Sequence, residues 1–479
     1  MRLPLLLALA LALAAPATAA PLALTGGTVI DGTGGPAFVP GNVVIDHGRV
    51  LCAGTAAACR APRGAKRFDA KGKFVMPGLV DAHVHLGQTG WIDGRPDGIS
   101  APALYPYAQT IAVLRADPLR WQRAYLCSGV TAAYDVGGQP WTIDVARGSD
   151  ANPDGVHLRA AGPLVTQVAA RVSIDNLPGQ PTFIPLPAPA DAPATVARLK
   201  AMGSHAVKLW FIAPKPGERA DIDARVMALG AAVKAAGLPL IVHATELREA
   251  KVALSAGASY LVHDVFDAPV DDAFLALFKA NHAVMAPTLV VGAGWTQAIA
   301  AVASGRAPTV RDPNGCVDAA IRDRIAHPER LRPFADKNML DPARLAQGAE
   351  RTRAELLTGS RNLAVIYRAG GRIVLGTDAG NPLTLHGPSV NDELEAMQAA
   401  GIPPSALIPI ATRNGAQAMG GAALFGTLTP GKAADLIVLE ADPRADIANV
   451  RRLAFVMRAG KMHAQSTLRS TQAAIVTQR

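Results

Sequence analysis

Short apolar runs alternate with helix-like stretches along the middle of the chain. Eight runs have the length and composition of buried strands, namely residues 74–85, 130–136, 157–162, 205–211, 238–243, 258–263, 283–290 and 372–377. Ala-rich stretches such as 220–236 and 247–256 lie between several of these runs and have the composition of helices. Strands that alternate with helices are typical of a parallel α/β fold, and eight such strands fit a closed (β/α)8 barrel. We therefore predict a TIM-like α/β barrel over residues 74–425.

The two ends of the chain share a different pattern. Residues 21–73 and 426–479 contain short strand-like segments separated by Gly and polar residues, which is typical of a small sheet domain. Because both ends have this pattern and flank the barrel, we expect one small β-sandwich built from both termini. The interval 291–371 is too long for a simple crossover and includes a helical pattern over 342–369, so we expect an elaborated lid or flank there.

Residues 1–20 have the features of a secretory signal peptide. Arg2 is followed by a run of Leu and Ala, and Ala17-Thr18-Ala19 forms a small-residue cleavage pattern. The apolar stretch is short for a membrane span and is followed by no cluster of charges, so we expect no stable membrane anchor. The sequence therefore predicts an exported protein, either periplasmic or secreted.

Export permits disulfides, and the chain has four cysteines. Cys52 and Cys59 are close enough in sequence to close a small loop, but the sequence leaves open whether they pair. Cys127 lies among apolar residues, and we expect it to be buried. Because the chain contains no Cys-x-x-Cys motif, nothing indicates a cysteine-based metal or redox site.

Composition and charge narrow the class of partner. Hydrophobic residues make up 50% of the chain and charged residues 18%, which is typical of a globular protein rather than a disordered one. The formal net charge is +9, but the basic residues are dispersed, so nucleic-acid binding is disfavoured. A small-molecule substrate, attracted if it is anionic, fits this balance better.

Candidate chemistry lies at the ends of the predicted strands. His83 and His85 end the first strand, and their imidazoles converge because residues two apart in a strand point to the same side. Two imidazoles held side by side are a good start to a metal site. Further polar residues in or beside later strands are Lys208, His243, His263 and Asp378. The C-terminal face of a barrel holds its catalytic groups, so we expect these side chains to meet there.

Several motifs follow one another in order along the chain. They are Pro77-Gly78-Leu79-Val80-Asp81-Ala82-His83-Val84-His85, Val242-His243-Ala244, Val262-His263, Gly376-Thr377-Asp378-Ala379-Gly380-Asn381-Pro382, His386-Gly387-Pro388-Ser389, Ala411-Thr412-Arg413-Asn414-Gly415-Ala416, and Gly426-Thr427-Leu428 through Asp435. In these motifs the chain resembles the amidohydrolase superfamily, in particular its imidazolonepropionase-like and Xaa-Pro dipeptidase-like branch. The resemblance covers nearly all of the mature chain and is more specific for the superfamily than for a substrate.

The resemblance implies two divalent metal ions, most often zinc. The implied ligands are His83, His85 and Asp378 for one ion, and His243 and His263 for the other. Lys208 would bridge both ions as a carbamate formed with carbon dioxide, because a carbamate offers two anionic oxygens whereas an ammonium group repels cations. Asp378 would also be catalytic, taking a proton from the attacking water and passing it to the leaving nitrogen.

The same resemblance implies hydrolysis of an amide bond by metal-activated hydroxide, with a dipeptide or an N-acyl amino acid carrying a free carboxylate as the favoured substrate. A cyclic amide or a lactone is the alternative, and a catalytically silent barrel that only binds its ligand is a third interpretation. Candidate substrate contacts are His386, Lys215 and Arg219, each with an ordinary structural role in a loop as the alternative. Trp91, Tyr105 and Tyr107 would either line the pocket or pack in the core. Enzymes of this kind often form homo-oligomers, but no motif here sets a number of subunits.

Overall fold

The computed structural model describes residues 20–92 and 95–470. The predicted signal peptide, residues 1–20, falls almost entirely outside these ranges and remains a prediction. Among the described residues, no helix is both long enough and apolar enough to cross a membrane.

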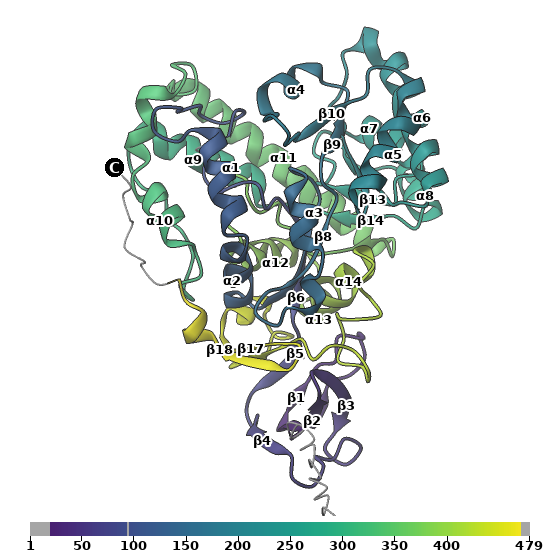
Figure 1. The fold of residues 1–479 in the computed structure, drawn as a ribbon, viewed down its shortest axis with the longest axis vertical. Coiled ribbons are helices and arrows are strands. Elements are labelled where there is room, and N and C mark those ends of the chain that lie inside the picture. Colours follow the sequence, from purple (N-terminus) through teal and green to yellow (C-terminus); the bar gives the residue numbers. More distant parts are fainter. Residues whose placement is uncertain (1–19, 93–94, 471–479) are drawn as a thin grey trace, which may run out of the picture.

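A sheet of eight strands combines both ends of the chain, as the sequence pattern predicts. Its N-terminal strands are β1 (Leu22–Val29), β2 (Phe38–Asp46), β3 (Arg49–Thr55), β4 (Lys66–Asp69) and β5 (Phe74–Pro77). Its C-terminal strands are β16 (Leu436–Leu439), β17 (Leu453–Arg458) and β18 (Lys461–Ala464). The two ends of the chain meet where β16 pairs antiparallel with β5. This sheet has its own apolar core around Leu24, Val43 and Val75, and it forms the lower end of the molecule in Figure 1.

The apolar run 74–85 divides between two sheets at Gly78. Its first part is β5 of the terminal sheet, and its second part is β6 (Leu79–Val84), the first strand of the barrel. Any side chain at position 78 would collide with Thr131, because a Cβ there would lie 2.2 Å from its Oγ1. The single strand predicted over 74–85 is therefore two strands, since strand composition alone does not distinguish two strands joined by one glycine.

The middle of the chain forms the predicted parallel barrel. Its strands after β6 are β7 (Val130–Asp135), β8 (His157–Ala160), β11 (Val207–Trp210), β12 (Leu240–His243), β13 (Tyr260–Val262), β14 (Val284–Ala286) and β15 (Arg372–Ile373). The ring closes on one side where Ala82 N donates to Leu375 O at 2.9 Å, and on the other where His205 N donates to Ala160 O at 2.9 Å. A short parallel pair that the sequence pattern does not predict, β9 (Leu164–Thr166) and β10 (Phe183–Pro185), lies beside β11.

Helices surround the barrel in Figure 1. They are α1 (Tyr107–Ala116), α2 (Leu119–Cys127), α3 (Trp141–Ala146), α4 (Ala169–Asp175), α5 (Ala192–Met202), α6 (Arg219–Ala236), α7 (Leu247–Ser255), α8 (Asp272–Ala280), α9 (Val291–Ser304), α10 (Ala319–Ala326), α11 (Pro342–Arg368), α12 (Ser389–Ala399), α13 (Pro404–Pro409) and α14 (Gly415–Ala418). The stretches predicted as helices over 220–236, 247–256 and 342–369 correspond to α6, α7 and α11.

The interval 291–371 is an elaborated helical flank, as predicted, and consists of α9, α10, α11 and irregular segments. The long helix α11 begins sharply because Asp341 caps it, accepting a hydrogen bond from Arg344 N at 2.9 Å, and because Pro342 occupies its first turn. Residues of this flank line the cavity described below, so it contributes directly to the site.

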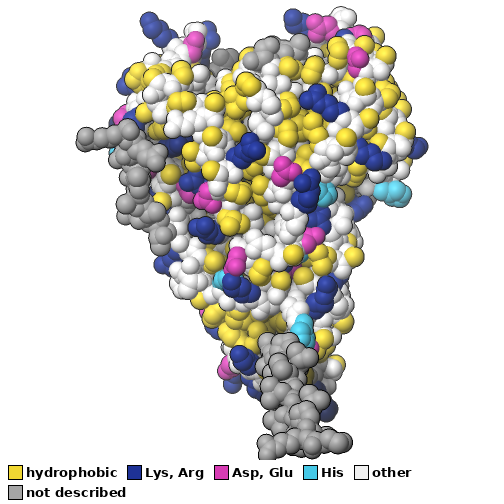
Figure 2. All heavy atoms as spheres, in the orientation of Figure 1, with side chains coloured by type: hydrophobic (Ala, Val, Ile, Leu, Met, Phe, Trp, Pro, Cys, Tyr) yellow, Lys and Arg dark blue, Asp and Glu magenta, His cyan; other side chains and the backbone are white. Residues whose placement is uncertain are grey.

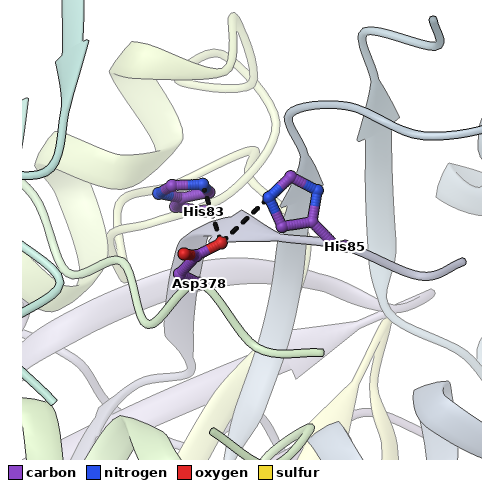
Figure 3. A group of neighbouring side chains, drawn as sticks. All are labelled: His83, His85 and Asp378. Atoms are coloured by element: carbon purple, nitrogen blue, oxygen red, sulfur yellow. Dashed lines mark ion pairs between the residues drawn. The ribbon is translucent and has the colours of Figure 1, made fainter. Parts of the chain in front are cut away.

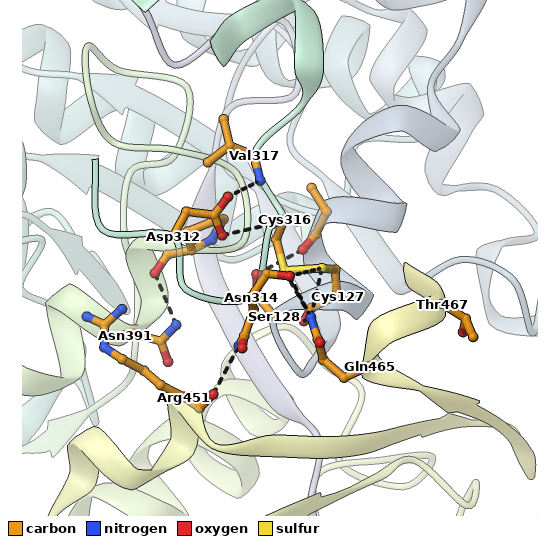
Figure 4. The surroundings of a disulfide bond; sticks show 12 residues. Cys127, Ser128, Asp312, Asn314, Cys316, Val317, Asn391, Arg451, Gln465 and Thr467 are labelled. Atoms are coloured by element: carbon orange, nitrogen blue, oxygen red, sulfur yellow. Dashed lines mark hydrogen bonds between the residues drawn. A yellow bond between two sulfur atoms is a disulfide. The ribbon is translucent and has the colours of Figure 1, made fainter. Parts of the chain in front are cut away.

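Two disulfides link the four cysteines. Cys52 pairs with Cys59 inside the terminal sheet domain, which resolves the alternative left open by the sequence. Cys127, buried as expected, pairs with Cys316 across 189 residues of sequence and ties α2 to the irregular segment of the flank. Figure 4 shows Gln465 beside this disulfide, where its Nε2 donates to Asn314 O at 2.9 Å. The second disulfide therefore joins the barrel wall to the flank, and Gln465 attaches the C-terminal segment beside it.

Charged side chains are dispersed over the visible surface. On the face in Figure 2, Lys and Arg lie scattered among Asp and Glu, and neither kind gathers over one element. This face therefore has no basic stripe of the kind that nucleic-acid binding requires.

Candidate metal centre

Three predicted ligands meet at one end of the barrel. The alternation of side chains along β6 directs His83 and the following His85 to the same place, and Asp378 follows β15. Asp378 Oδ1 lies 3.2 Å from His83 Nε2 and 2.9 Å from His85 Nε2, as Figure 3 shows. One ligand atom from each residue lies within 4.8 Å of the others, so this group could hold one metal ion.

The remaining predicted ligands lie beside this group. The imidazole rings of His243 and His263 are 4.4 Å apart between centroids, and that of His263 is 5.1 Å from the ring of His83. Lys208 is only 2% exposed and lines the same cavity as His85, His243, His263 and Asp378. The chain thus brings together residues from strands that are far apart in sequence.

The backbone is strained where it presents two of these ligands. Asp378 has a φ of 61° and His263 has a φ of 67°, both in the left-handed region that non-glycine residues seldom adopt. Thr288, which contacts His263, also has a positive φ of 52°. Strained backbone persists only where surrounding contacts enforce it, and such positions cluster at functional sites.

Hydrogen bonds behind the imidazoles fix their orientation. His85 Nδ1 donates to Gly137 O at 2.6 Å, and His263 Nδ1 shares a hydrogen bond with Thr288 Oγ1 at 2.7 Å. The Gly137 carbonyl requires a protonated Nδ1 on His85, so Nε2 of this ring retains a lone pair for a metal. The loop that carries Thr288 is itself held by Glu393, which accepts hydrogen bonds from Leu289 N and Val290 N at 3.0 and 3.1 Å.

Asp81 holds the loop that carries Asp378. Its carboxylate accepts hydrogen bonds from Thr377 N at 3.0 Å and Thr377 Oγ1 at 2.6 Å. Burial raises the pKa of Asp81 to about 7 in spite of these bonds. Asp81 is therefore a positioning residue, one step behind the candidate ligand.

Burial controls the charge of the site. It lowers the pKa of His83 to about 4 and that of His243 to about 3, so both imidazoles are neutral at physiological pH, as metal ligands must be. Burial opposes ionisation of Asp378, but the neighbouring His83 and His85 outweigh it and hold the pKa of this carboxyl well below its usual range.

Lys208 has the electrostatic environment that carbamate formation needs. Burial lowers the pKa of its amine to about 7, so a substantial fraction is unprotonated at neutral pH. Only the unprotonated amine has the lone pair that attacks carbon dioxide, and this observation fits the modification implied by the sequence resemblance.

The donor set also fits a metal ion. Both ring nitrogens of His83 and Oδ1 of Asp378 are buried, and apart from the approach of Asp378 Oδ1 to His83 Nε2 and His85 Nε2 they have no polar partner within the described residues. Buried polar atoms without partners are costly. Neutral imidazole and carboxylate are ligands that zinc accepts, so a divalent cation would satisfy these atoms.

The sequence of the barrel and the C-terminal strands matches the Amidohydrolase family over residues 74–463. The chain belongs to this family.

The curated relatives of this amidohydrolase are named for different activities. A 5-methylthioadenosine/S-adenosylhomocysteine deaminase of Symbiobacterium thermophilum is 39% identical over 69 residues, which are 14% of this chain and 16% of the deaminase. An imidazolonepropionase of Cupriavidus taiwanensis is 51% identical over 47 residues, which are 10% of this chain and 11% of that protein. The amidohydrolase thus matches less than a fifth of the length of these curated relatives.

Likeness in fold extends over nearly the whole amidohydrolase chain. A Xaa-Pro dipeptidase solved with methionine bound in its active site superimposes with a TM-score of 0.68 and 20% identity. The superposition covers 93% of this chain and 100% of the dipeptidase chain. At this identity the comparison establishes the fold, including the barrel and the terminal sheet.

The expected substrate contacts lie away from the cavity. Lys215 and Arg219 are exposed, beyond the end of β11, and neither lines the cavity. His386 is buried: its Nε2 donates to Gln88 O at 2.9 Å, its Nδ1 lies 2.8 Å from Tyr125 Oη, and its ring stacks on Trp121. These positions do not support a substrate-binding role, because His386 supports the loop after β6 and the two basic residues face solvent.

The aromatic candidates divide between packing and lining. Trp91 is fully buried, and Tyr105 packs against the core. Tyr107 lines the cavity, where its Oη accepts a hydrogen bond from Gln139 Nε2 at 3.1 Å.

The cavity contains residues that strand-end reasoning misses. It has a volume of about 330 Å³ and includes the charged side chains Arg95, Asp97, Arg171 and Asp175 and the aromatic side chains Phe183, Trp210 and Trp295. Arg95 and Asp97 come from a loop, Arg171 and Asp175 from α4, Phe183 from β10 and Trp295 from the flank, and none of these lies at the end of a predicted strand. Trp210 is the exception, because it lies two residues after Lys208 on the same face of β11 and could have been found by the alternation of side chains.

The metal-free amidohydrolase should lose stability on acidification. An unfolded His titrates near 6.5, whereas burial holds the pKa of His83 at about 4 and that of His243 at about 3. Between these values the unfolded chain binds more protons, so the free energy of unfolding falls as the pH falls below 6.5. We expect the Tm of EDTA-treated protein to drop by about 5 °C between pH 7 and pH 5. A double variant, His83→Asn with His243→Asn, should flatten this dependence, and a flat wild-type profile would contradict it.

Proposed function

We propose that this amidohydrolase is an exported enzyme that holds two divalent metal ions and hydrolyses the amide bond of a dipeptide or an N-acyl amino acid. The observation that carries the proposal is the convergence of imidazoles, a buried lysine and a carboxylate around one cavity in a chain of this family. The names of the relatives, which include a Xaa-Pro dipeptidase and an imidazolonepropionase, are consistent with a C–N bond as the bond that is cleaved.

The metals would be held by the residues that the sequence motifs indicate. His83, His85 and Asp378 would hold one ion, and His243 and His263 would hold the other, with carbamylated Lys208 between them. Zinc is proposed because the donors are neutral nitrogens and carboxylate-type oxygens. When bound, the ions would polarise the substrate carbonyl and lower the pKa of water.

Asp378 would move the proton. Its Oδ1 is directed at His83 and His85, which leaves Oδ2 to receive the proton of the attacking water and deliver it to the leaving nitrogen. Hydrogen bonding of the adjacent Thr377 to Asp81 keeps this carboxylate in place during the transfer.

Two features support export. The N-terminal residues have the pattern of a signal peptide, and all four cysteines pair in disulfides, which persist in oxidising compartments. We propose a periplasmic or secreted location on this basis.

A small open-chain amide fits the cavity. A volume of about 330 Å³ suits a molecule of small-ligand size, and the cavity wall includes arginine, which can offer a counter-charge for a carboxylate.

A substrate panel tests the proposal. Metal-loaded protein is assayed against Xaa-Pro and other dipeptides and against N-acyl amino acids such as hippurate, with cyclic imides and lactones as competing classes. We expect cleavage of open-chain amides that bear a carboxylate. Opening of a lactone or a cyclic imide without cleavage of any open-chain amide would contradict the proposed substrate class.

A further inference from the structure

Arg171 lies on the cavity wall between carboxylates and aromatic rings. It belongs to α4, and its Nε and Nη2 lie 2.7 Å from Asp175 Oδ2 and 3.3 Å from Asp97 Oδ2, close enough for ion pairs, although the Nε contact lacks hydrogen-bond geometry. Its guanidinium carbon is 5.5 Å from the centre of the Trp210 ring and 5.8 Å from that of Phe183. Stacking and ion pairing together hold the group in a defined orientation.

The second arginine on the wall has all its nitrogens engaged. Arg95 Nε and Nη2 bind Asp97 at 2.8 Å each, and its Nη1 donates to Gln88 Oε1 at 2.9 Å and to Asn381 Oδ1 at 2.7 Å. Within the described residues, Arg171 Nη1 makes no such hydrogen bond or ion pair. Of these two arginines, Arg171 is therefore the one whose guanidinium has a nitrogen, Nη1, available to a ligand.

One indole ring separates this guanidinium from the candidate metal centre. Trp210 and Lys208 share a face of β11, and the ring of Trp210 is 6.0 Å from that of His243. A substrate whose scissile carbonyl lies at the metal ligands would extend across the indole toward Arg171.

Asp175 competes for the same guanidinium. It is almost fully buried, and apart from Arg171 no ion-pair partner is recorded for it within the described residues. Asp97, by contrast, is shared with Arg95. Removing the charge of Asp175 would therefore free the Nε edge of Arg171 as well as its Nη1.

We propose that Arg171 is the specificity-determining residue of the site and binds the carboxylate of the substrate, with the substrate body lying over Trp210. This assignment rests on the proposed function and names the group that recognises its substrate class. It replaces Lys215 and Arg219, which face solvent.

A matched pair of probes tests the assignment. Hippurate carries a carboxylate, hippuramide replaces it with a neutral carboxamide, and both keep the benzoyl–glycine amide bond and an aromatic ring. In Arg171→Met we expect KM for hippurate to rise about 10-fold or more with little change in kcat, whereas KM for hippuramide changes less than about 3-fold. Arg171→Lys keeps the charge but loses the planar fork, so an intermediate loss is expected.

Two further variants control for structure. Arg219→Met removes an exposed arginine outside the cavity and should leave both probes unaffected. Asp175→Asn should lower KM for hippurate and leave KM for hippuramide unchanged. The Tm of each variant reports whether the fold is retained.

Binding measured without turnover separates this assignment from the proposed function. Calorimetry on metal-loaded Asp378→Asn protein should give tighter binding of hippurate than of hippuramide, and adding Arg171→Met should remove the difference. Equal losses for both probes, or a parent protein that does not prefer hippurate, would overturn the assignment. Carboxylate-dependent binding by Arg171 in a protein that cleaves no amide would instead overturn the proposed function and leave the assignment intact.

Discussion

Asp378→Asn is expected to lower kcat by about 1,000-fold while the Tm stays close to that of the parent protein. An asparagine amide has nearly the shape of the carboxylate but cannot accept the proton of the attacking water. The backbone should tolerate the exchange, because Asp378 has a φ of 61° and asparagine is among the residues that adopt this region most readily. Steady-state kinetics on metal-loaded protein, together with elemental analysis of the variant, separate loss of proton transfer from loss of metal.

Asp81→Asn is the matched control for this prediction. Asp81 is also a buried aspartate of the site, but it contacts Thr377 rather than the cavity. An amide at position 81 still accepts from Thr377 N, so its effect on kcat should be smaller by about 10-fold or more. If Asp378→Asn kept both its metals and most of its turnover, the proton-transfer role would be wrong. A parent protein without turnover that keeps its ligand affinity in Asp378→Asn would instead indicate a barrel that only binds.

Removing the Cys127–Cys316 disulfide is expected to cost about 5 kcal/mol of free energy of unfolding. The bond closes a loop across 189 residues, and a long closed loop restricts the unfolded chain most strongly. For a chain of this length the loss corresponds to roughly 5 °C in Tm. The measurement is thermal unfolding of the double variant Cys127→Ala with Cys316→Ala.

The Cys52–Cys59 bond provides the comparison. It closes a loop across only 7 residues, so the corresponding pair of alanine substitutions should cost about half as much on the same argument. The flank also has other attachments, such as Asn314 Nδ2 to Arg451 O at 3.1 Å, and these should keep the Cys127/Cys316 variant folded at room temperature. Equal effects of the two double variants would contradict the account.

Much of this molecule could be predicted from the sequence because its signals are local. Two histidines separated by one residue at the end of a strand must direct their side chains to the same face of the sheet. His83 and His85 do so, and Asp378 Oδ1 contacts both. The start of the long helix α11 is indicated in the sequence by its cap residue Asp341 and by Pro342 in its first turn. The terminal sheet follows from similar strand patterns at both ends of the chain.

The rest depends on contacts that no local pattern contains. Lys215 and Arg219 are basic residues just after a strand, yet both are exposed, whereas Arg171 of α4 lines the cavity. Gly78 divides one apolar run between two sheets because of its proximity to Thr131, which is remote in sequence. The pairing of Cys127 with Cys316 spans 189 residues and is likewise a product of the tertiary fold.

The central claim is that six side chains hold two metal ions with Lys208 between them. Elemental analysis of the purified protein, with Lys208→Ala as the control, tests it most directly. The account predicts about two zinc-like ions per chain in the parent protein and fewer in the control. No ion or a single ion in the parent protein, or an unchanged pair in Lys208→Ala, would contradict it.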